Sequence, residues 1–256
     1  MNHNPCDAIA LVPSVLLPSL LSTWTSKINL AYQKLEAERQ QHGLEGVSRL
    51  VAPGQRFVPT ASSLTIGAVL SDENLRALFA ALNLAPAGSW TRNQLQDRVA
   101  CDLDQAWVRR QYAPRHYPPL HAPHGWHQDG ALGFDFLAAR EGQFPPDALL
   151  PMVTCWIALG SCGADAPGLE LVTRRLEELL APADLTAQSV RARFAPDDFW
   201  QPILDPGDAL LFRGDILHRT HVTSSMTEDR TSLELRFFPA DSLPARLKGD
   251  RFLPVA

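Results

Sequence analysis

From residue 101 onward the chain consists largely of short, strand-like runs separated by Gly, Pro and Asp, and this pattern constrains the fold most. Regularly spaced short strands with such breaks are typical of an antiparallel barrel or jelly roll. One helical interruption is expected at about residues 174–180. The predicted strands lie at 106–112, 153–159, 169–172, 209–212, 217–222 and 232–238.

The first hundred residues show helical rather than alternating periodicity. Apolar residues recur at helical spacing from Ser19, and Gly43 follows the last charged turn as a stop signal. A second helix is predicted from Ser71 to Pro86, and Thr91 with a Gln three residues later indicates a short third helix to about Val99. Residues 1–18 read as an apolar arm and 43–63 as irregular chain.

Together these patterns predict a mainly β protein with α-helices, in one domain spanning residues 1–256. We expect mainly helical support from residues 1–100 and a double-stranded β-helix core (jelly-roll, cupin-like) at 101–240. Residues 241–256 are interpreted as a C-terminal tail.

Composition excludes several classes of partner. A net charge of −5 without a Lys/Arg-rich run gives no electrostatic footprint for nucleic acid. Prolines interrupt the longest apolar stretch before it could span a bilayer, and the N-terminus lacks the basic region of a signal peptide. The four cysteines show no Cys-x-x-Cys spacing. We therefore expect a cytoplasmic protein with reduced thiols and no membrane association.

The residues that indicate chemistry are His127, Asp129 and His218. Two histidines and one carboxylate form the facial triad of non-haem Fe(II) enzymes. On extended backbone, His127 and Asp129 would project from the same face of a strand. The histidines at 116, 121 and 124 lie in a Pro-rich loop, where surface or hydrogen-bonded roles are the simpler interpretation.

A wider set of motifs resembles the phytanoyl-CoA dioxygenase family. They are Trp126-His127-Gln128-Asp129-Gly130, Gly207-Asp208 followed by His218, Arg230-Thr231-Ser232 and Arg236-Phe237, with comparable strands at 153–159 and 168–172. The resemblance spans about residues 107–238. It implies an enzyme that uses Fe(II), 2-oxoglutarate and O2, with His127, Asp129 and His218 as iron ligands and Arg230 as the 2-oxoglutarate anchor.

Further cosubstrate contacts follow from the strand pattern and the resemblance. Thr220 shares a strand face with His218, Trp156 would pack beside 2-oxoglutarate or in the core, and one of Arg109 and Arg110 should face the barrel interior. Gln128 alternates away from the iron, although related enzymes use this position near the cosubstrate. Arg236 is an alternative anchor to Arg230.

The expected reaction is hydroxylation of an unactivated C–H bond of a small organic metabolite, with release of succinate and CO2. Related halogenases replace the carboxylate ligand with a small residue, whereas Asp129 is retained here. Two alternatives remain open: a cupin-type metal enzyme without 2-oxoglutarate, and a non-catalytic barrel that binds a small ligand. Substrate and oligomeric state are not readable from the sequence. Residues 131–151, rich in Phe, are expected to shape the entrance.

Overall fold

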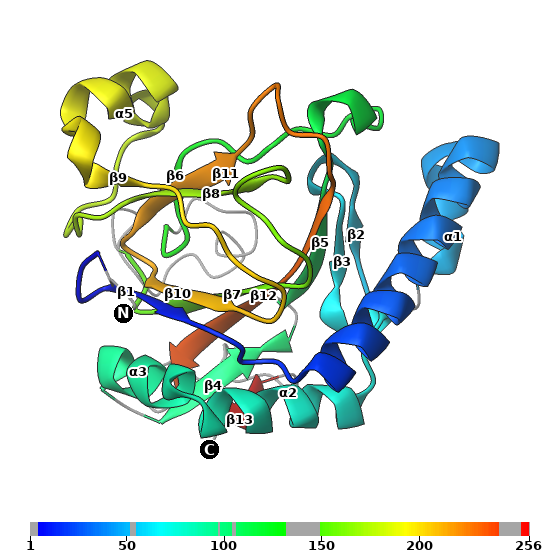
Figure 1. Cartoon of the computed structure of the whole chain (residues 1–256), viewed down its shortest axis with the longest axis horizontal. Helices are drawn as coiled ribbons and strands as arrows, with labels where there is room; N and C mark the ends of the chain where they lie inside the picture. Colours follow the sequence, from blue (N-terminus) through cyan, green and yellow to red (C-terminus); the bar gives the residue numbers. More distant parts are fainter. Residues whose placement is uncertain are drawn as a thin grey trace, which may run out of the picture.

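The chain folds into two antiparallel β-sheets that face each other, with helices around them (Figure 1). The computed structural model describes residues 5–51, 55–96, 98–103, 106–131, 149–240 and 252–255. The helices are α1 (Pro18–Leu50), α2 (Asp72–Leu84), α3 (Pro86–Leu95) and α5 (Ala187–Arg193). The strands are β1 (Ile9–Val12), β2 (Phe57–Val58), β3 (Ser63–Thr65), β4 (Val99–Asp102), β5 (Trp107–Gln111), β6 (His127–Gln128), β7 (Val153–Ala158), β8 (Gly168–Val172), β9 (Phe199–Trp200), β10 (Ala209–Arg213), β11 (Leu217–His221), β12 (Arg230–Pro239) and β13 (Phe252–Val255).

The strands from β5 to β12 are shared between the two sheets in the manner of a double-stranded β-helix. In the larger sheet the order is β1-β10-β7-β12-β5-β3-β2, with β4 pairing β12 and β13 pairing β4. The smaller sheet has the order β6-β11-β8-β9. The predicted strands of the core are therefore present, close to their predicted bounds.

Alternation along β7 separates the helix-facing core from the barrel interior. Val153, Cys155 and Ile157 are buried with apolar residues of the helices, whereas Thr154 and Trp156 line the space between the sheets. The same alternation recurs on β12, because successive strand side chains point to opposite faces. On β7, polar side chains therefore point into the space between the sheets, and apolar ones point towards the helices.

Helices α1, α2 and α3 pack beside the outer face of the larger sheet (Figure 1). Ser71 caps α2 by accepting a hydrogen bond from the Asn74 amide, and the predicted apolar face of this helix is buried. Gly43, predicted as a stop, has φ 62° and ψ −153° inside α1 and marks a kink, after which the helix continues to Leu50.

Two predicted helices differ from the structure. The third helix begins at Pro86 rather than Thr91, whose hydroxyl donates to the Ala87 carbonyl inside α3. Residues 174–180 form bends instead of a helix, and their apolar side chains Leu176 and Leu180 pack in a cluster with Val172 and Leu217 of the smaller sheet. The helix in this region is α5, which the Thr186 hydroxyl caps. The spacing of the apolar residues in 174–180 is therefore compatible both with a helix and with a loop that packs on the sheet, and it did not distinguish the two.

Both ends of the chain join the larger sheet, which the sequence did not predict. Within the expected apolar arm, β1 pairs with β10 so that Ile9 lies opposite Phe212. Within the expected tail, β13 pairs with β4. In its described part, the stretch of the first hundred residues therefore combines helices with β1, β2, β3 and the start of β4. Among the described residues, no helix has both the length and the apolar character needed to cross a membrane.

Candidate metal centre

The three predicted ligands come together between the two sheets. His127 on β6 lies opposite His218 on β11 in the strand register, and Asp129 lies in the turn directly after β6. The Nε2 atom of His127 is 3.7 Å from Oδ1 of Asp129, and Nε2 of His218 is 4.0 Å from the same oxygen. One donor atom from each residue falls within 4.8 Å of the others. This spacing allows all three atoms to bind a single metal ion.

Backbone carbonyls fix which nitrogen of each imidazole faces the carboxylate. Nδ1 of His127 lies 2.7 Å from the Gly125 carbonyl oxygen, and Nδ1 of His218 lies 3.0 Å from that of Ile216. A carbonyl oxygen can only accept, so Nδ1 carries the proton in both rings. Nε2 then keeps its lone pair on the side of Asp129. Such carbonyl partners are the usual support of metal-binding histidines.

The carboxylate of Asp129 is held ionised although it is buried. The Thr154 hydroxyl donates to Oδ2 at 2.5 Å, and Nη2 of Arg236 lies 3.3 Å from Oδ1. Burial alone would raise the pKa of Asp129, but Arg236, the two histidines and Thr154 outweigh it and hold that pKa below its usual range. The oxygen is therefore available as an anionic ligand at neutral pH.

The histidines are held neutral by the same environment. Burial, together with the neighbouring His218, lowers the pKa of His127 to about 3. Burial also lowers the pKa of His218, although Asp129 acts in the opposite direction. Two neutral imidazoles and one carboxylate are the donor set that suits non-haem Fe(II). The described residues thus fit the metal that the sequence motif implies.

A buried arginine, two of whose nitrogens find no acceptor among the described residues, lies in the same cavity. Arg230, at the start of β12, is 1% exposed, and its Nε and Nη1 atoms have no hydrogen-bond partner among the described residues. Its guanidinium carbon lies 4.7 Å from the centroid of the Trp156 ring. Burial lowers the pKa of Arg230 to about 10. Buried guanidinium donors need an acceptor, so this position suits a ligand carboxylate.

The structure places the remaining predicted residues differently. Thr220 and Trp156 both line the cavity with the three candidate ligands. Gln128 does not: its amide nitrogen lies within hydrogen-bond distance of the carbonyls of Glu178 and Asp215, and its oxygen accepts from the Leu180 amide. Gln128 therefore anchors the 174–180 segment and points away from the cavity, as alternation on its strand predicts.

Arg109 faces the barrel interior, as one of the two neighbouring arginines was expected to do. Its Nη2 atom pairs with Glu234 at 3.0 Å, and its Nη1 atom lies 3.3 Å from Nδ1 of His124. The anionic partner of Arg109 is therefore the side chain of Glu234, and its charge does not need a bound ligand for compensation. Arg110 points to the opposite side, where it contacts Asn29 and Glu36.

Sequence reasoning missed several residues of the cavity. His124, given a surface or hydrogen-bonded role, lines the cavity and lies with its ring 5.5 Å from that of His127. Thr154 and Glu234 were not singled out. Strand alternation could have found both, because Thr154 precedes Trp156 by two residues and Glu234 lies two residues before Arg236. The Phe-rich part of the expected entrance, residues 132–148, lies outside the described residues.

Fold and site together define a jelly-roll protein with a three-residue candidate metal centre between its sheets. No protein-family model matches the chain, and no curated protein matches it in sequence. Solved structures do match it, and among them are an alpha ketoglutarate dependent epimerase and proteins with iron or 2-oxoglutarate bound.

One similar structure is SnoN, the non-heme alpha ketoglutarate dependent epimerase from nogalamycin biosynthesis, at 15% identity and a TM-score of 0.56, covering 98% of this chain and 94% of that one. Another is EctD from S. alaskensis with bound Fe, at 13% identity and a TM-score of 0.63, covering 92% and 74%. HygX from Streptomyces hygroscopicus, with nickel, 2-oxoglutarate and hygromycin B bound, matches at 14% identity and a TM-score of 0.52, covering 96% and 92%. At such identities the likeness confirms the predicted fold.

Proposed function

We propose that this protein is an Fe(II)- and 2-oxoglutarate-dependent oxygenase of the phytanoyl-CoA dioxygenase type that acts on a small organic molecule. The observation that carries the proposal is the coincidence, in one cavity, of the His127–Asp129–His218 cluster and the buried guanidinium of Arg230, whose Nε and Nη1 atoms have no hydrogen-bond partner among the described residues. Either feature alone occurs in unrelated barrels. Their combination suits a metal together with a chelating dicarboxylate.

The residues have separable roles in this proposal. Nε2 of each histidine and one oxygen of Asp129 would hold Fe(II). Iron with 2-oxoglutarate and O2 supplies the oxidising chemistry, and the protein supplies binding and orientation. Arg230 would bind the distal carboxylate of 2-oxoglutarate, with Trp156 stacked against the guanidinium and Thr220 nearby.

Hydroxylation is the proposed outcome among several that this chemistry permits. Asp129 occupies the carboxylate position, so the site lacks the gap that a halide would fill. SnoN is an epimerase, and SnoK, which matches at a TM-score of 0.53, is a carbocyclase. Substrate shape near the metal therefore decides the outcome, and the apolar side chains Leu169 and Phe212 form part of that wall.

The test is an anaerobic titration of the protein with Fe(II) and 2-oxoglutarate, following the weak visible charge-transfer band of the chelate. The wild type is compared with His218→Ala and with His42→Ala, whose exposed histidine lies on α1 away from the cavity. We expect the band in the wild type and in the His42 variant, and its loss in the His218 variant. Succinate release would then serve to screen candidate substrates.

The same titration separates the alternatives. Iron binding without a 2-oxoglutarate-dependent band would contradict the proposal and favour a cupin-type metal enzyme. Failure to bind iron would favour a barrel that binds a small ligand without metal chemistry. Arg230, whose Nε and Nη1 atoms have no hydrogen-bond partner among the described residues, argues against the cupin-type alternative, since an enzyme that uses no 2-oxoglutarate needs no such buried donors.

A further inference from the structure

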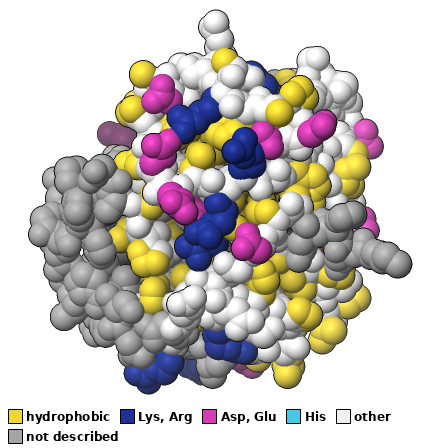
Figure 2. Space-filling view, turned by 90° about the vertical axis from the view of Figure 1, so that its left-hand side faces the viewer, with side chains coloured by type: hydrophobic (Ala, Val, Ile, Leu, Met, Phe, Trp, Pro, Cys, Tyr) yellow, Lys and Arg dark blue, Asp and Glu magenta, His cyan; other side chains and the backbone are white. Residues whose placement is uncertain are grey.

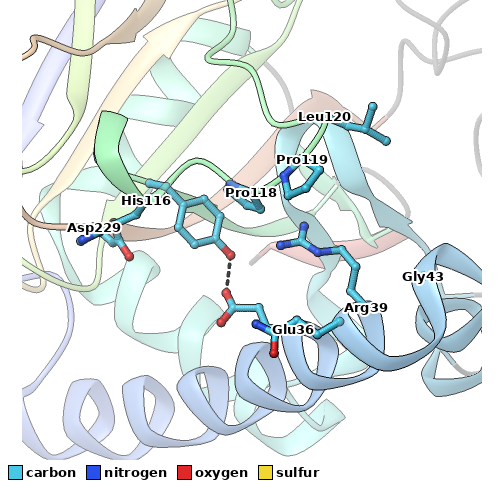
Figure 3. Close-up of a pocket in the computed structure, with 10 residues that line it drawn as sticks. Glu36, Arg39, Gly43, His116, Pro118, Pro119, Leu120 and Asp229 are labelled. Carbon is cyan, nitrogen blue, oxygen red and sulfur yellow. Dashed lines mark hydrogen bonds and ion pairs between the residues drawn. The ribbon is translucent and has the colours of Figure 1, made fainter.

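A second cavity, outside the barrel, is not used by the proposed reaction. It has a volume of about 660 Å³ and lies between α1 and the loop that follows β5 (Figure 3). Its walls include Glu36, Arg39, Tyr112, His116 and Asp229. Cavities of this size are typical of small-molecule sites.

The two acidic groups of this cavity already have donors, whereas its arginine has no acceptor. Glu36 accepts a hydrogen bond from the Tyr112 hydroxyl, and Asp229 is paired with His116 at 2.8 Å and accepts from the Ala113 amide at 2.9 Å. Arg39 is half-buried and makes no hydrogen bond or ion pair with any described residue. Its guanidinium extends from α1 towards Pro118 and Pro119 (Figure 3).

The wall opposite Arg39 is apolar and held in an uncommon backbone conformation. Pro118, Pro119 and Leu120 form this wall, and the Leu120 side chain is 64% exposed. Leu120 has φ 69°, a left-handed conformation that a branched side chain seldom adopts. Such outliers cluster at ligand sites, where the surrounding structure maintains them. On the α1 side, Gly43 lies at the helix kink and leaves the cavity without a side chain at that point.

We propose that this cavity is a second small-molecule site, which binds an organic acid through Arg39 and packs its apolar body on Pro118, Pro119 and Leu120. A guanidinium matches a carboxylate with two parallel hydrogen bonds, and an apolar wall would not select an inorganic anion. The site is separate from the metal centre and does not depend on the proposed oxygenase activity.

The cavity is nonetheless connected to the barrel through the backbone. Asp229 precedes Arg230, and Tyr112 follows Gln111, which lies opposite Arg230 in the pairing of β5 with β12. Gln111 also contacts His121, whose ring packs edge-on against Tyr112. The outer cavity and Arg230 therefore lie at adjacent positions of the same two paired strands.

The experiment measures binding of 3-phenylpropanoate and of its neutral amide, 3-phenylpropanamide, by ligand-observed NMR. The full chain is first saturated with 2-oxoglutarate and Zn(II), so that the barrel cavity is occupied. We expect the acid to bind at least about tenfold more tightly than the amide, since one charge-assisted hydrogen bond accounts for such a factor. Arg39→Met should weaken binding of the acid by about tenfold and leave binding of the amide unchanged.

Lys34→Met is the matched control, because it removes a positive charge from an exposed position of α1 that does not line this cavity. The control should bind the acid as the wild type does. Equal affinity of acid and amide, equal binding by the Arg39 variant, or equally tight competition by inorganic phosphate would overturn the proposal. His218→Ala should retain the site, so loss of metal chemistry and loss of this site are distinguishable.

Discussion

Nη2 of Arg236 lies 3.3 Å from Oδ1 of Asp129, within the buried cavity of the barrel. Through this contact the guanidinium of Arg236 is engaged by the candidate metal ligand Asp129. Arg230, six residues earlier on the same strand face, is left with donors that no described residue accepts. The geometry therefore favours Arg230 as the cosubstrate anchor and assigns Arg236 to the carboxylate ligand.

Substitution of the two arginines should consequently affect different binding measurements. We expect Arg230→Met to weaken 2-oxoglutarate binding by about 10- to 100-fold with little change in metal affinity, because a charged hydrogen-bond partner is removed from the cosubstrate alone. Arg236→Met should lower the affinity for the metal ion, because it removes the positive charge beside the Asp129 carboxylate. Metal titration and the chelate band measure the two effects. Loss of 2-oxoglutarate binding only in the Arg236 variant would reverse the assignment.

Thr154 should affect the metal without touching it. Its hydroxyl donates to Oδ2 of Asp129, and loss of such a support typically costs about 10- to 100-fold in metal affinity. We expect this loss for Thr154→Val, measured by competition with a chelator. Thr173→Val is the control, because its hydroxyl donates to the Asp198 carbonyl on another part of the molecule. Equal metal affinity in the two variants would show that the hydroxyl does not orient the ligand.

His121 should make the metal-free protein less stable at mildly acidic pH. Its ring is hydrogen-bonded to Ser62 and Gln111, and burial, with Arg109, lowers its pKa to about 4. The unfolded chain has the ordinary value of about 6.5, so it binds the proton first and stability falls as pH drops from about 6.5 towards 4. One such group contributes a slope of at most about 1.4 kcal/mol per pH unit.

The measurement is the free energy of unfolding in urea as a function of pH. His121→Asn should reduce the slope between pH 6.5 and 4, whereas Gln41→Ala, at an exposed position of α1 without a titratable group, should leave it unchanged. An identical slope in the His121 variant and the wild type would mean that this residue does not contribute.

Gly163 should be intolerant of any side chain. It has φ 96°, and an added Cβ would lie 2.4 Å from the Pro202 carbonyl oxygen. We expect Gly163→Ala to lower the free energy of unfolding by about 1–3 kcal/mol through backbone strain. Gly160→Ala is the control, because a Cβ there meets no atom within 4 Å and should change stability by less than about 0.5 kcal/mol. Equal stability of both variants would contradict the strained geometry.

One side of the molecule illustrates how little surface charge alone reveals. On the side shown in Figure 2, basic and acidic side chains are interspersed among apolar ones rather than gathered in one patch. This mixture agrees with the absence of a basic run in the sequence.

Local patterns in the sequence determined much of the fold and the ligands. The apolar spacing of residues 75–82 defined the buried face of α2, whereas Gly43, predicted to end the first helix, only kinks it. The spacing of His127 and Asp129, with His218 on a second strand, identified the cluster that the structure brings together. These features depend on neighbours within a few residues, so periodicity and residue type suffice to find them.

Only the tertiary structure decided which side chains meet across strands. The pairing of Arg109 with Glu234 and His124, and of Arg236 with Asp129, depends on the register between strands that are far apart in sequence. The inclusion of β1 and β13 in the larger sheet depends on the same long-range pairing. A strand pattern specifies which face a residue occupies but not its partner, because the partner is set by how the whole sheet assembles.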